Sequence, residues 1–528
     1  MKRSRPTPGG QNRARNRRGA PAGETNLADL LAAQGNVFEW SPLRDRGTSV
    51  HFVGIGGYGM SALAQVLCDL GYRVTGSDLH PSPRTARLRE RGVIITFEHS
   101  PANVEGASMV VYSTDVPATN PELLAARGAK IPVYHRSELL ASLMASRFSI
   151  AITGTHGKTT TTAMIAFLLA RQGLDPTVLV GADFDPIGGT GYLGRGRYLV
   201  AEADESDRSF LRYPPLVAVV TNVEPEHLEH YDGDFGRVEQ AYHEFVSNVP
   251  PDGHLVLCTD DPTLRRIARS IEIPVTGYGW DDLTGLRAAG LQVDRKGTAF
   301  EVFQGSRSLG PVRLEIPGRH NVLNALAAIA VGLKLGMTFE SLAATLGSYR
   351  GPRRRFEVCG QAAGITVVDD YAHHPTEIRE TLAAARQRAT GRVLAVFQPQ
   401  RYVRTHNLMR EFSRAFSGAD HLVLTPIYSP PGDTVIPGVS SWSLARLIEE
   451  HEGRSVVYLE EAFDIVSYLL RLAMPGDLII TMGAGDIGQV AHRLASELAG
   501  ERTDPPPRPR ANSHTRANRP LIFSRHMC

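Results

Sequence analysis

Residues 148–162 read FSIAITGTHGKTTTT, an apolar segment that runs into a loop with two glycines and then into four threonines. This order predicts a buried strand, a tight phosphate-binding loop and a helix. The loop resembles a P-loop, although Ile152 stands where the strict pattern has its first glycine. Its backbone N–H groups can hold phosphates, Lys158 can neutralise the β and γ oxygens, and Thr159 can hold Mg²⁺. We therefore expect an ATP site in an α/β domain.

Acidic side chains follow a second apolar strand, which we expect at Tyr198–Ala201. The stretch Glu202–Asp207 reads EADESD and holds four carboxylates. Carboxylates crowded at the end of a strand repel one another unless cations neutralise them. His227 follows a further strand expected at Val217–Thr221, at the edge of a parallel sheet where ligand sites collect. These positions predict magnesium beside the ATP site, while a solvated acidic loop and a structural histidine are the plainer alternatives.

A glycine-rich turn nearer the N-terminus predicts another phosphate site. Gly54–Gly59 reads GIGGYG, between a strand expected at Val50–Val53 and a helix expected at Ser61–Leu70. Free N–H groups at the start of such a helix attract a diphosphate. Asp78 stands about where a Rossmann unit places its ribose-binding acid. A dinucleotide and a nucleotide-sugar both carry a diphosphate, so this pattern does not choose between them.

The alternation of strands and helices predicts three α/β domains in series. We expect a Rossmann-like domain at 48–145, a central P-loop ATPase-like domain at 146–350 and a second Rossmann-like domain at 351–498. The region from about 280 to 316 alternates polar and apolar residues, which favours a small antiparallel excursion.

Two polar groups follow strands in the third block. The segment DDYAHHPTE at 369–377 follows a strand expected at Thr366–Val368, and FQPQRYVRT at 397–405 ends another at Val393–Phe397. Arg401 and Arg404 are suited to bidentate binding of a carboxylate or phosphate. Further strands are expected at His421–Thr425 and Asp477–Thr481.

The bulk composition is that of a soluble globular protein. The chain has 528 residues, of which 42% are hydrophobic and 21% charged, and no apolar run approaches the ~20 residues that span a bilayer. Four scattered cysteines without CxxC spacing fit a reducing compartment, so we expect a cytoplasmic protein. Residues 1–47 and 499–528 form a basic extension and a Pro/Arg-rich tail that we expect to be disordered. Both can make weak contacts with anionic partners, while an incidental extension is the plainer alternative.

Taken together, these motifs resemble those of the Mur ligase family over roughly residues 48–498. The resemblance is carried by HFVGIGGYGMS, GTHGKTTTT, EADESDRSFL, GRHNVLNALAA, DDYAHHPTEI, FQPQRY and GAGDIG. It implies that the first domain holds a UDP-sugar, the central domain holds ATP, and the third domain closes over them. It also implies the reaction: ATP phosphorylates the lactyl carboxylate of UDP-N-acetylmuramate, and the amine of L-alanine attacks the acyl phosphate, in peptidoglycan precursor synthesis.

The resemblance, together with the patterns above, assigns residues to four roles. Substrate binding is assigned to Gly54, Gly56, Gly57, Tyr58, Gly59, Met60, Asp78 and Ser113. ATP binding is assigned to Gly154, Thr155, His156, Gly157, Lys158, Thr159, Thr160, Asn321, Asn324, Arg355 and Asp370. Two Mg²⁺ ions are assigned the ligands Thr159, Glu202, Glu205 and His227. The catalytic groups are Lys158, His373, His374 and Arg401. The residues that depart from those usual in the family are Tyr58, Ala372, Gln400 and Val403.

Three alternative functions remain beside this interpretation. An NAD-dependent oxidoreductase would use the first glycine-rich turn and Asp78, but it leaves the P-loop and the acidic loop without a role. A P-loop motor or nucleic-acid ATPase would use the basic tails, although the central motifs require no nucleic acid. Within the family, an enzyme that adds a whole recycled peptide to the same sugar nucleotide is the nearest alternative, and HFVGIGG and GTHGKTTTT favour transfer of alanine.

Overall fold

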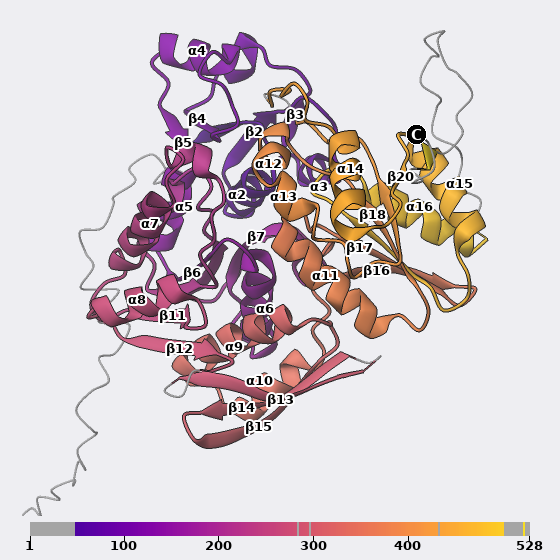
Figure 1. Ribbon diagram of the computed structural model, residues 1–528. Helices are drawn as coiled ribbons and strands as arrows, with labels where there is room; N and C mark the ends of the chain where they lie inside the picture. The colour runs from indigo at the N-terminus through magenta and orange to yellow at the C-terminus, as the bar shows by residue number, and fades with distance from the viewer. Residues whose placement is uncertain (1–47, 282–284, 295–296, 431–432, 501–520, 523–528) are drawn as a thin grey trace, which may run out of the picture. The chain divides into compact units, whose positions relative to one another are not determined.

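The structure is a computed structural model that describes residues 48–281, 285–294, 297–430 and 433–500, and the backbone of 521–522. The described chain forms three sheets of mostly parallel strands, each with helices between its strands (Figure 1). The predicted fold class, three α/β domains in series, is therefore confirmed. The expected extension at 1–47 lies outside the described residues, as does most of the tail at 499–528.

The N-terminal sheet is wholly parallel and has the strand order β3-β2-β1-β4-β5. This is the order of the first five strands of a Rossmann fold. Its strands are β1 (Ser49–Val53), β2 (Arg73–Ser77), β3 (Ile94–Thr96), β4 (Met109–Tyr112) and β5 (Val133–His135). Its helices are α2 (Tyr58–Asp69), α3 (Pro83–Glu90), the short η2 (Pro101–Val104), α4 (Pro121–Gly128) and α5 (Arg136–Ala145). The strand expected at Val50–Val53 is confirmed as part of β1, whereas β3 and β5 were not predicted because three residues show no clear period.

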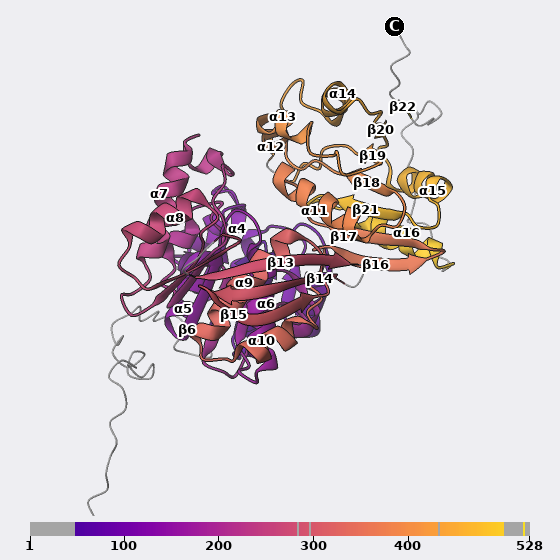
Figure 2. The same cartoon turned by 60° about the horizontal axis from the view of Figure 1, so that its bottom comes forward.

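The central sheet has the order β15-β14-β13-β12-β11-β10-β6-β9-β7-β8. Its parallel strands are β6 (Phe148–Thr153), β7 (Thr177–Phe184), β9 (Tyr198–Glu202), β10 (Val217–Val220), β11 (His254–Cys258), β12 (Val275–Gly279) and the start of β13 (Leu286–Asp294). The antiparallel pairings add β8 (Gly189–Tyr192), β14 (Gly297–Gln304) and β15 (Arg307–Leu314). Figure 2 shows β13, β14 and β15 side by side, which confirms the antiparallel excursion expected near 280–316.

The helices of the central domain bury apolar faces on this sheet. They are α6 (Lys158–Arg171), α7 (Phe235–Ser247), α8 (Pro262–Ser270), α9 (Arg319–Lys334) and α10 (Phe339–Leu346), with short turns η3 (Asp185–Ile187), η4 (Ser209–Arg212) and η5 (Leu228–His230). Helix α6 is buried from Thr159 to Leu169, so its threonines face protein rather than solvent. Burial of this helix fixes the loop in front of it.

The C-terminal sheet has the order β16-β17-β21-β18-β19-β20-β22. Its strands are β16 (Glu357–Ala362), β17 (Ile365–Asp370), β18 (Val393–Phe397), β19 (His421–Leu424), β20 (Val457–Tyr458), β21 (Leu478–Met482) and β22 (Leu521–Ile522). Its helices are α11 (Pro375–Arg388), α12 (Tyr402–Asn407), α13 (Met409–Phe412), α14 (Ser441–Glu452), α15 (Ala462–Leu472) and α16 (Gly488–Leu498). Strand β22 pairs with β20 inside the expected tail, which the sequence did not predict.

Two apolar clusters cover the two faces of this sheet. One contains Ile378 and Leu382 of α11 with Leu444 of α14. The other contains Leu469 of α15 and Leu494 of α16, and Figure 1 shows strands β17 and β18 between α11 and that pair of helices. Burial on both faces explains why the strands read as continuous apolar runs.

Candidate active site

The phosphate-binding loop lies between β6 and α6, and its glycines permit its shape. Gly157 has a φ of +83°, and a Cβ there would lie 2.6 Å from Asn324 Oδ1. Gly154 has a φ of +131°, and a Cβ there would lie 2.0 Å from Thr221 Oγ1. Any larger side chain would be strained and would also clash. The loop therefore packs tightly on the strand β10 end and on α9.

Lys158 is held over this loop by a carboxylate and two carbonyl groups. Its ammonium donates to Gly154 O at 2.7 Å and Thr155 O at 3.2 Å, and it lies 2.8 Å from Glu205 Oε2. Burial alone would lower the pKa of Lys158, but the nearby carboxylates, Glu205 foremost, raise it. Lys158 is therefore a fixed positive charge, as phosphate binding requires.

Thr159 and Glu202 form a second contact beside the loop. Thr159 Oγ1 donates to Glu202 Oε2 at 3.0 Å, and Gly181 N donates to the same oxygen at 2.9 Å. His227 has a left-handed φ of 54° and lines the same cavity as Glu202. A hydroxyl and a carboxylate are oxygen donors of the kind that bind magnesium near phosphates, and His227 adds an imidazole to the same cavity. Glu205, also predicted as a ligand, pairs with Lys158 instead.

A cavity of about 540 Å³ gathers loops from all three domains. Its walls include the start of α2 at Tyr58 and the P-loop at Lys158. Arg401 reaches it from the loop before α12, and its guanidinium lies 3.9 Å from Asp115. The predicted site residues that line this cavity are Gly57, Tyr58, Gly59, Met60, Ser113, Thr155, Gly157, Lys158, Thr159, Thr160, Glu202, His227, Arg355, His373 and Arg401.

A second cavity, of about 430 Å³, adjoins the other side of the P-loop. The predicted site residues that line it are His156, Gly157, Thr160, Asn321, Asn324, Arg355 and Asp370. Asn324 donates to Asn321 Oδ1 at 3.2 Å, which orders the start of α9. Arg355 lines both cavities and donates to Thr159 Oγ1 at 3.4 Å. The second cavity has the position expected for the rest of a nucleotide whose phosphates bind the loop.

Six predicted residues line neither cavity: Gly54, Gly56, Asp78, Gly154, Glu205 and His374. Asp78 accepts a hydrogen bond from Gly56 N at 2.7 Å, and a Cβ at Gly56 would lie 2.7 Å from the same carboxylate. Asp78 therefore supports the glycine-rich turn from behind. His374 caps α11 by accepting from Thr376 N at 3.3 Å.

His373 is a neutral imidazole in a defined tautomer. Its Nδ1 lies 2.9 Å from Tyr371 O, and because a carbonyl oxygen accepts, Nδ1 carries the proton. Burial lowers the pKa of His373 to about 4. The Nε2 atom therefore keeps a lone pair at neutral pH, and it can accept a hydrogen bond from a ligand.

Sequence reasoning missed two charged residues of the site, Arg136 and Glu226. Arg136, on α5, lies 3.6 Å from Asp204 and 3.5 Å from Asp207, and lines the larger cavity. Glu226 pairs with Arg404 at 3.1 Å, and both side chains are almost buried. Glu226 lies in the EPEH segment at 224–227, whose two carboxylates and histidine could have indicated a functional role, whereas Arg136 lies in no motif.

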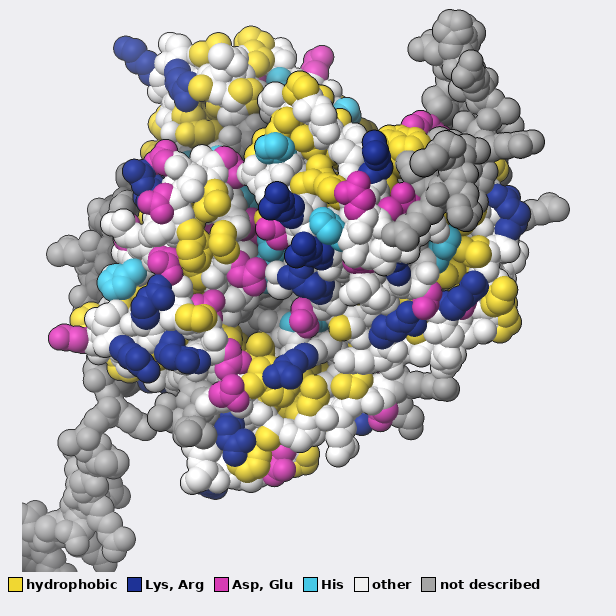
Figure 3. Space-filling model, viewed as in Figure 1, with side chains coloured by type: hydrophobic (Ala, Val, Ile, Leu, Met, Phe, Trp, Pro, Cys, Tyr) yellow, Lys and Arg dark blue, Asp and Glu magenta, His cyan; other side chains and the backbone are white. Residues whose placement is uncertain are grey.

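Charges of both signs surround the site. Figure 3 shows Lys and Arg side chains near α11, α12 and α13 with acidic and histidine side chains among them. On this face of the described residues, the basic side chains do not form an uninterrupted stripe of the kind that tracks a nucleic-acid backbone.

The comparison with protein families identifies the class. Residues 49–148 match the Mur ligase family, catalytic domain; residues 152–332 match the Mur ligase middle domain; and residues 354–485 match the Mur ligase, glutamate ligase domain. The chain belongs to the Mur ligase family, as its motifs predicted.

Two relatives with the same enzyme name indicate which members of the family this chain resembles. The UDP-N-acetylmuramate–L-alanine ligase of Symbiobacterium thermophilum is 54% identical over 459 residues, which cover 86% of this chain and 95% of the relative. The enzyme of the same name from Pelotomaculum thermopropionicum is 46% identical over 455 residues, 86% of this chain and 98% of the relative.

Solved structures allow an alanine ligase and a peptide ligase to be compared with this chain. The UDP-N-acetylmuramate-alanine ligase of Thermotoga maritima aligns with a TM-score of 0.75 at 29% identity, covering 86% of this chain and 99% of its own. A murein peptide ligase from Psychrobacter arcticus aligns with a TM-score of 0.64 at 25% identity, covering 87% and 100%. Among these, the alanine ligases are more similar to this chain than the peptide ligase is.

Proposed function

We propose that this chain is an ATP-dependent ligase that joins L-alanine to the lactyl carboxylate of UDP-N-acetylmuramate through an acyl phosphate, in peptidoglycan precursor synthesis. One observation carries the proposal: a single cavity is lined by the glycine-rich turn before α2, by Lys158 and Thr159, and by Arg401. A sugar nucleotide, a γ-phosphate and an amino acid can meet there. The names of the relatives support the choice of substrates.

Phosphorylation of the carboxylate comes first, because a carboxylate is a poor electrophile and needs a leaving group. A carboxylate oxygen attacks the γ-phosphorus, and ADP leaves. Lys158 and the N–H groups of the loop neutralise the phosphate oxygens. Thr159, Glu202 and His227 would hold magnesium, which when bound supplies further positive charge to the same oxygens. Glu205 fixes the position of Lys158.

Amide formation then takes place at the C-terminal side of the cavity. The neutral amine of L-alanine attacks the acyl carbon and forms the C–N bond. The tetrahedral intermediate then loses one N–H proton to solvent, and its C–O bond to phosphate breaks, so that phosphate leaves. Arg401 is suited to hold the carboxylate of the amino acid. The Nε2 lone pair of His373 can accept a hydrogen bond from the amine. Arg404 is held by Glu226 and Gln400, at 3.1 and 2.7 Å, and so shapes this end of the cavity.

The N-terminal domain presents the sugar nucleotide. Backbone N–H groups at the start of α2 are suited to bind a diphosphate. Tyr58 lies at that point, and the Arg84 guanidinium lies 4.0 Å from the centre of its ring. Arg84 Nε also donates to Gly56 O at 2.7 Å, so the arginine ties the turn to the tyrosine.

The cellular location of the reaction is also part of the proposal. No helix among the described residues is long and apolar enough to cross a lipid bilayer. The proposed substrates include nucleotides, so we place the reaction in the cytoplasm and assign no role to nucleic acid. The basic tails, if they contact anionic partners, do so apart from catalysis.

A phosphate-release assay tests the proposed function. The full chain is mixed with ATP and Mg²⁺, then with UDP-N-acetylmuramate, and then with L-alanine, glycine or L-serine in turn. We expect sustained release that needs both the sugar nucleotide and an amino acid and is fastest with L-alanine. A rate of phosphate release that is the same without the sugar nucleotide would contradict the proposal. So would a rate that rises with a peptide but not with L-alanine.

A further inference from the structure

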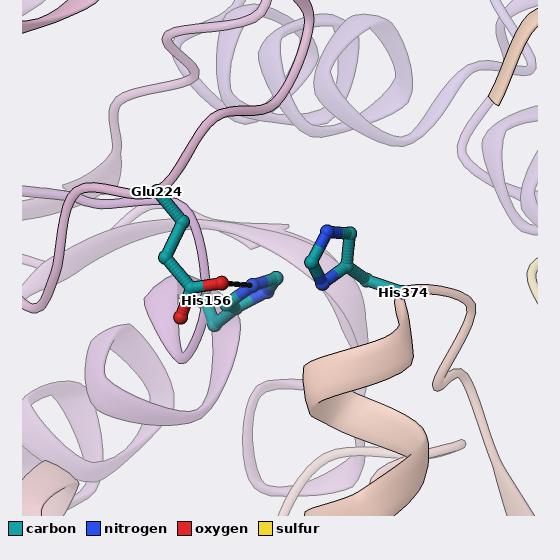
Figure 4. Close-up of side chains that lie close together, drawn as sticks. All are labelled: His156, Glu224 and His374. Carbon is teal, nitrogen blue, oxygen red and sulfur yellow. Dashed lines mark ion pairs between the residues drawn. The ribbon is translucent and has the colours of Figure 1, made fainter. Parts of the chain in front are cut away.

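Three side chains from separate loops converge behind the P-loop. His156 belongs to the P-loop, Glu224 follows β10, and His374 is the N-cap of α11. Figure 4 shows the His374 ring facing His156 and the Glu224 carboxylate. One ligand atom of each residue lies within 4.8 Å of the other two, and the two ring centroids are 4.8 Å apart. Two imidazoles and a carboxylate are the ligand set of many zinc sites.

The His156 ring is oriented as a metal-binding histidine usually is. Its Nδ1 lies 3.0 Å from Glu377 Oε1, so one ring nitrogen faces a carboxylate. Its Nε2 is buried without a hydrogen-bond partner, and the nearest carboxylate, that of Glu224, is 3.5 Å away. Metal-binding histidines commonly donate their second N–H to a carboxylate in this way. A ligand at this Nε2 would therefore replace only the 3.5 Å contact with Glu224.

The side chains of His374 and Glu224 are also held in place by hydrogen bonds. The His374 Nδ1 accepts from Thr376 N at 3.3 Å, so this nitrogen carries no proton, and an ion that binds it would replace the capping bond. Glu224 is fixed by Thr376 Oγ1 at 3.1 Å. The carboxylates of Glu224 and Glu377 lie 3.5 and 3.0 Å from the two nitrogens of the His156 ring. The surrounding carboxylates thus favour positive charge at this point.

We propose that His156, Glu224 and His374 bind one divalent transition-metal ion, of the Zn²⁺ or Co²⁺ type. The site is separate from the predicted magnesium ligands Thr159, Glu202 and His227. Nitrogen-rich ligands favour these ions over Mg²⁺. Bonds of about 2.0–2.2 Å place neighbouring ligand atoms roughly 3.4 Å apart, so the side chains close by about an ångström on binding.

Occupation would join the P-loop to the first turn of α11. Three protein ligands leave a fourth position for water or a ligand group. An ion bound to the folded chain also raises its apparent stability, since the unfolded chain lacks the site. This inference goes beyond the proposed ligase activity and does not depend on it, because its readout is metal binding without nucleotide.

Cobalt spectroscopy of the full chain tests the site. The protein is treated with a chelator, freed of it, and titrated with Co²⁺ alone near neutral pH. We expect one Co²⁺ per chain with the visible absorption of a four-coordinate ion, displaced by one Zn²⁺. Glu224→Gln keeps the shape of the side chain, so it is the variant least able to disturb folding; it should weaken Co²⁺ binding at least about tenfold. His156→Asn should do the same.

Two control variants separate this site from others. His227→Asn removes a predicted magnesium ligand, and Cys359→Ser disrupts the other cluster of metal-binding types among the described residues, Glu357, Cys359 and His492. Both should leave Co²⁺ affinity unchanged. Unchanged affinity in Glu224→Gln and His156→Asn, loss of the signal in either control, or absence of four-coordinate absorption at excess Co²⁺ would each overturn the proposal.

Discussion

The ammonium of Lys158 lies 2.8 Å from Glu205 Oε2, and the two side chains are 14% and 5% exposed. The pair places one fixed positive charge at the mouth of the P-loop. A buried charge left without its partner is costly, so each residue constrains the other. Glu205 and Glu202 therefore have different roles. Glu205 positions Lys158, whereas Glu202 contacts Thr159.

Lys158→Ala should abolish turnover, because it removes the charge that stabilises the transferred phosphoryl group. We expect kcat to fall at least about 10²-fold, the order of loss seen when one preorganised donor is removed. Phosphate release measures this. Arg195→Ala is the matched control, since the Arg195 side chain is 97% exposed. Near-normal release by Lys158→Ala would rule out the assigned role.

Glu202→Gln and Glu205→Gln should differ in their response to magnesium. Glu202 contacts Thr159, so its neutral variant should raise the Mg²⁺ concentration for half-maximal activity roughly tenfold. Glu205→Gln should lower kcat through a displaced Lys158 and leave the Mg²⁺ midpoint near that of the natural chain. Mg²⁺ titrations of phosphate release measure both. A shifted midpoint in Glu205→Gln, with none in Glu202→Gln, would reverse the assignment.

Tyr58→Ala should weaken binding of the sugar nucleotide. The ring lies 4.0 Å from the Arg84 guanidinium, and a contact of this kind contributes about 1 kcal/mol. We expect KM for UDP-N-acetylmuramate to rise several-fold with KM for ATP unchanged. Tyr58→Phe keeps the ring and serves as the control. Equal effects of the two variants would show that the hydroxyl, not the ring, matters.

Glu122 should make the N-terminal domain's stability depend on acid pH. Burial alone would raise the pKa of Glu122, but hydrogen bonds with His51, Ser77 and Asn103 lower it from 4.5 to about 2. Because the folded pKa is depressed, the ionised carboxylate stabilises fully above pH 4.5, and this contribution is lost as the pH falls towards 2.

Glu122→Gln should therefore reduce the free energy of unfolding by about 2–3 kcal/mol at neutral pH. The difference from the natural chain should narrow as the pH falls below 4.5. Urea unfolding at several pH values measures it, with exposed Glu90→Gln as the control. A difference that stays constant across this range would contradict the prediction.

Motifs at the ends of long buried strands were predictable from the sequence. The P-loop at Lys158 and the acidic loop at Glu202 each follow an apolar run, and parallel strands bring such ends to one edge of a sheet. The structure places these residues in contact through Thr159. Their assigned roles stay predictions, as do the domain boundaries.

Contacts between distant segments were not predictable in this way. Arg136 reaches Asp207 from a helix that carries no motif. His156 and Glu377 are 221 positions apart and meet because α11 begins beside the P-loop. Asp78 was expected to face a ribose, yet its carboxylate holds Gly56 N. The hydrophobic periodicity of the sequence predicts each helix or strand separately, so it does not predict which helices and strands contact one another.

The central claim is that the carboxylate is activated as an acyl phosphate beside Lys158. It is tested most directly with UDP-N-acetylmuramate whose lactyl carboxylate carries oxygen-18, incubated with the full chain, ATP, Mg²⁺ and L-alanine. Mass spectrometry of the released phosphate should show one labelled oxygen per phosphate, because the attacking carboxylate oxygen leaves with phosphorus. Amide product accompanied by unlabelled phosphate would contradict the account.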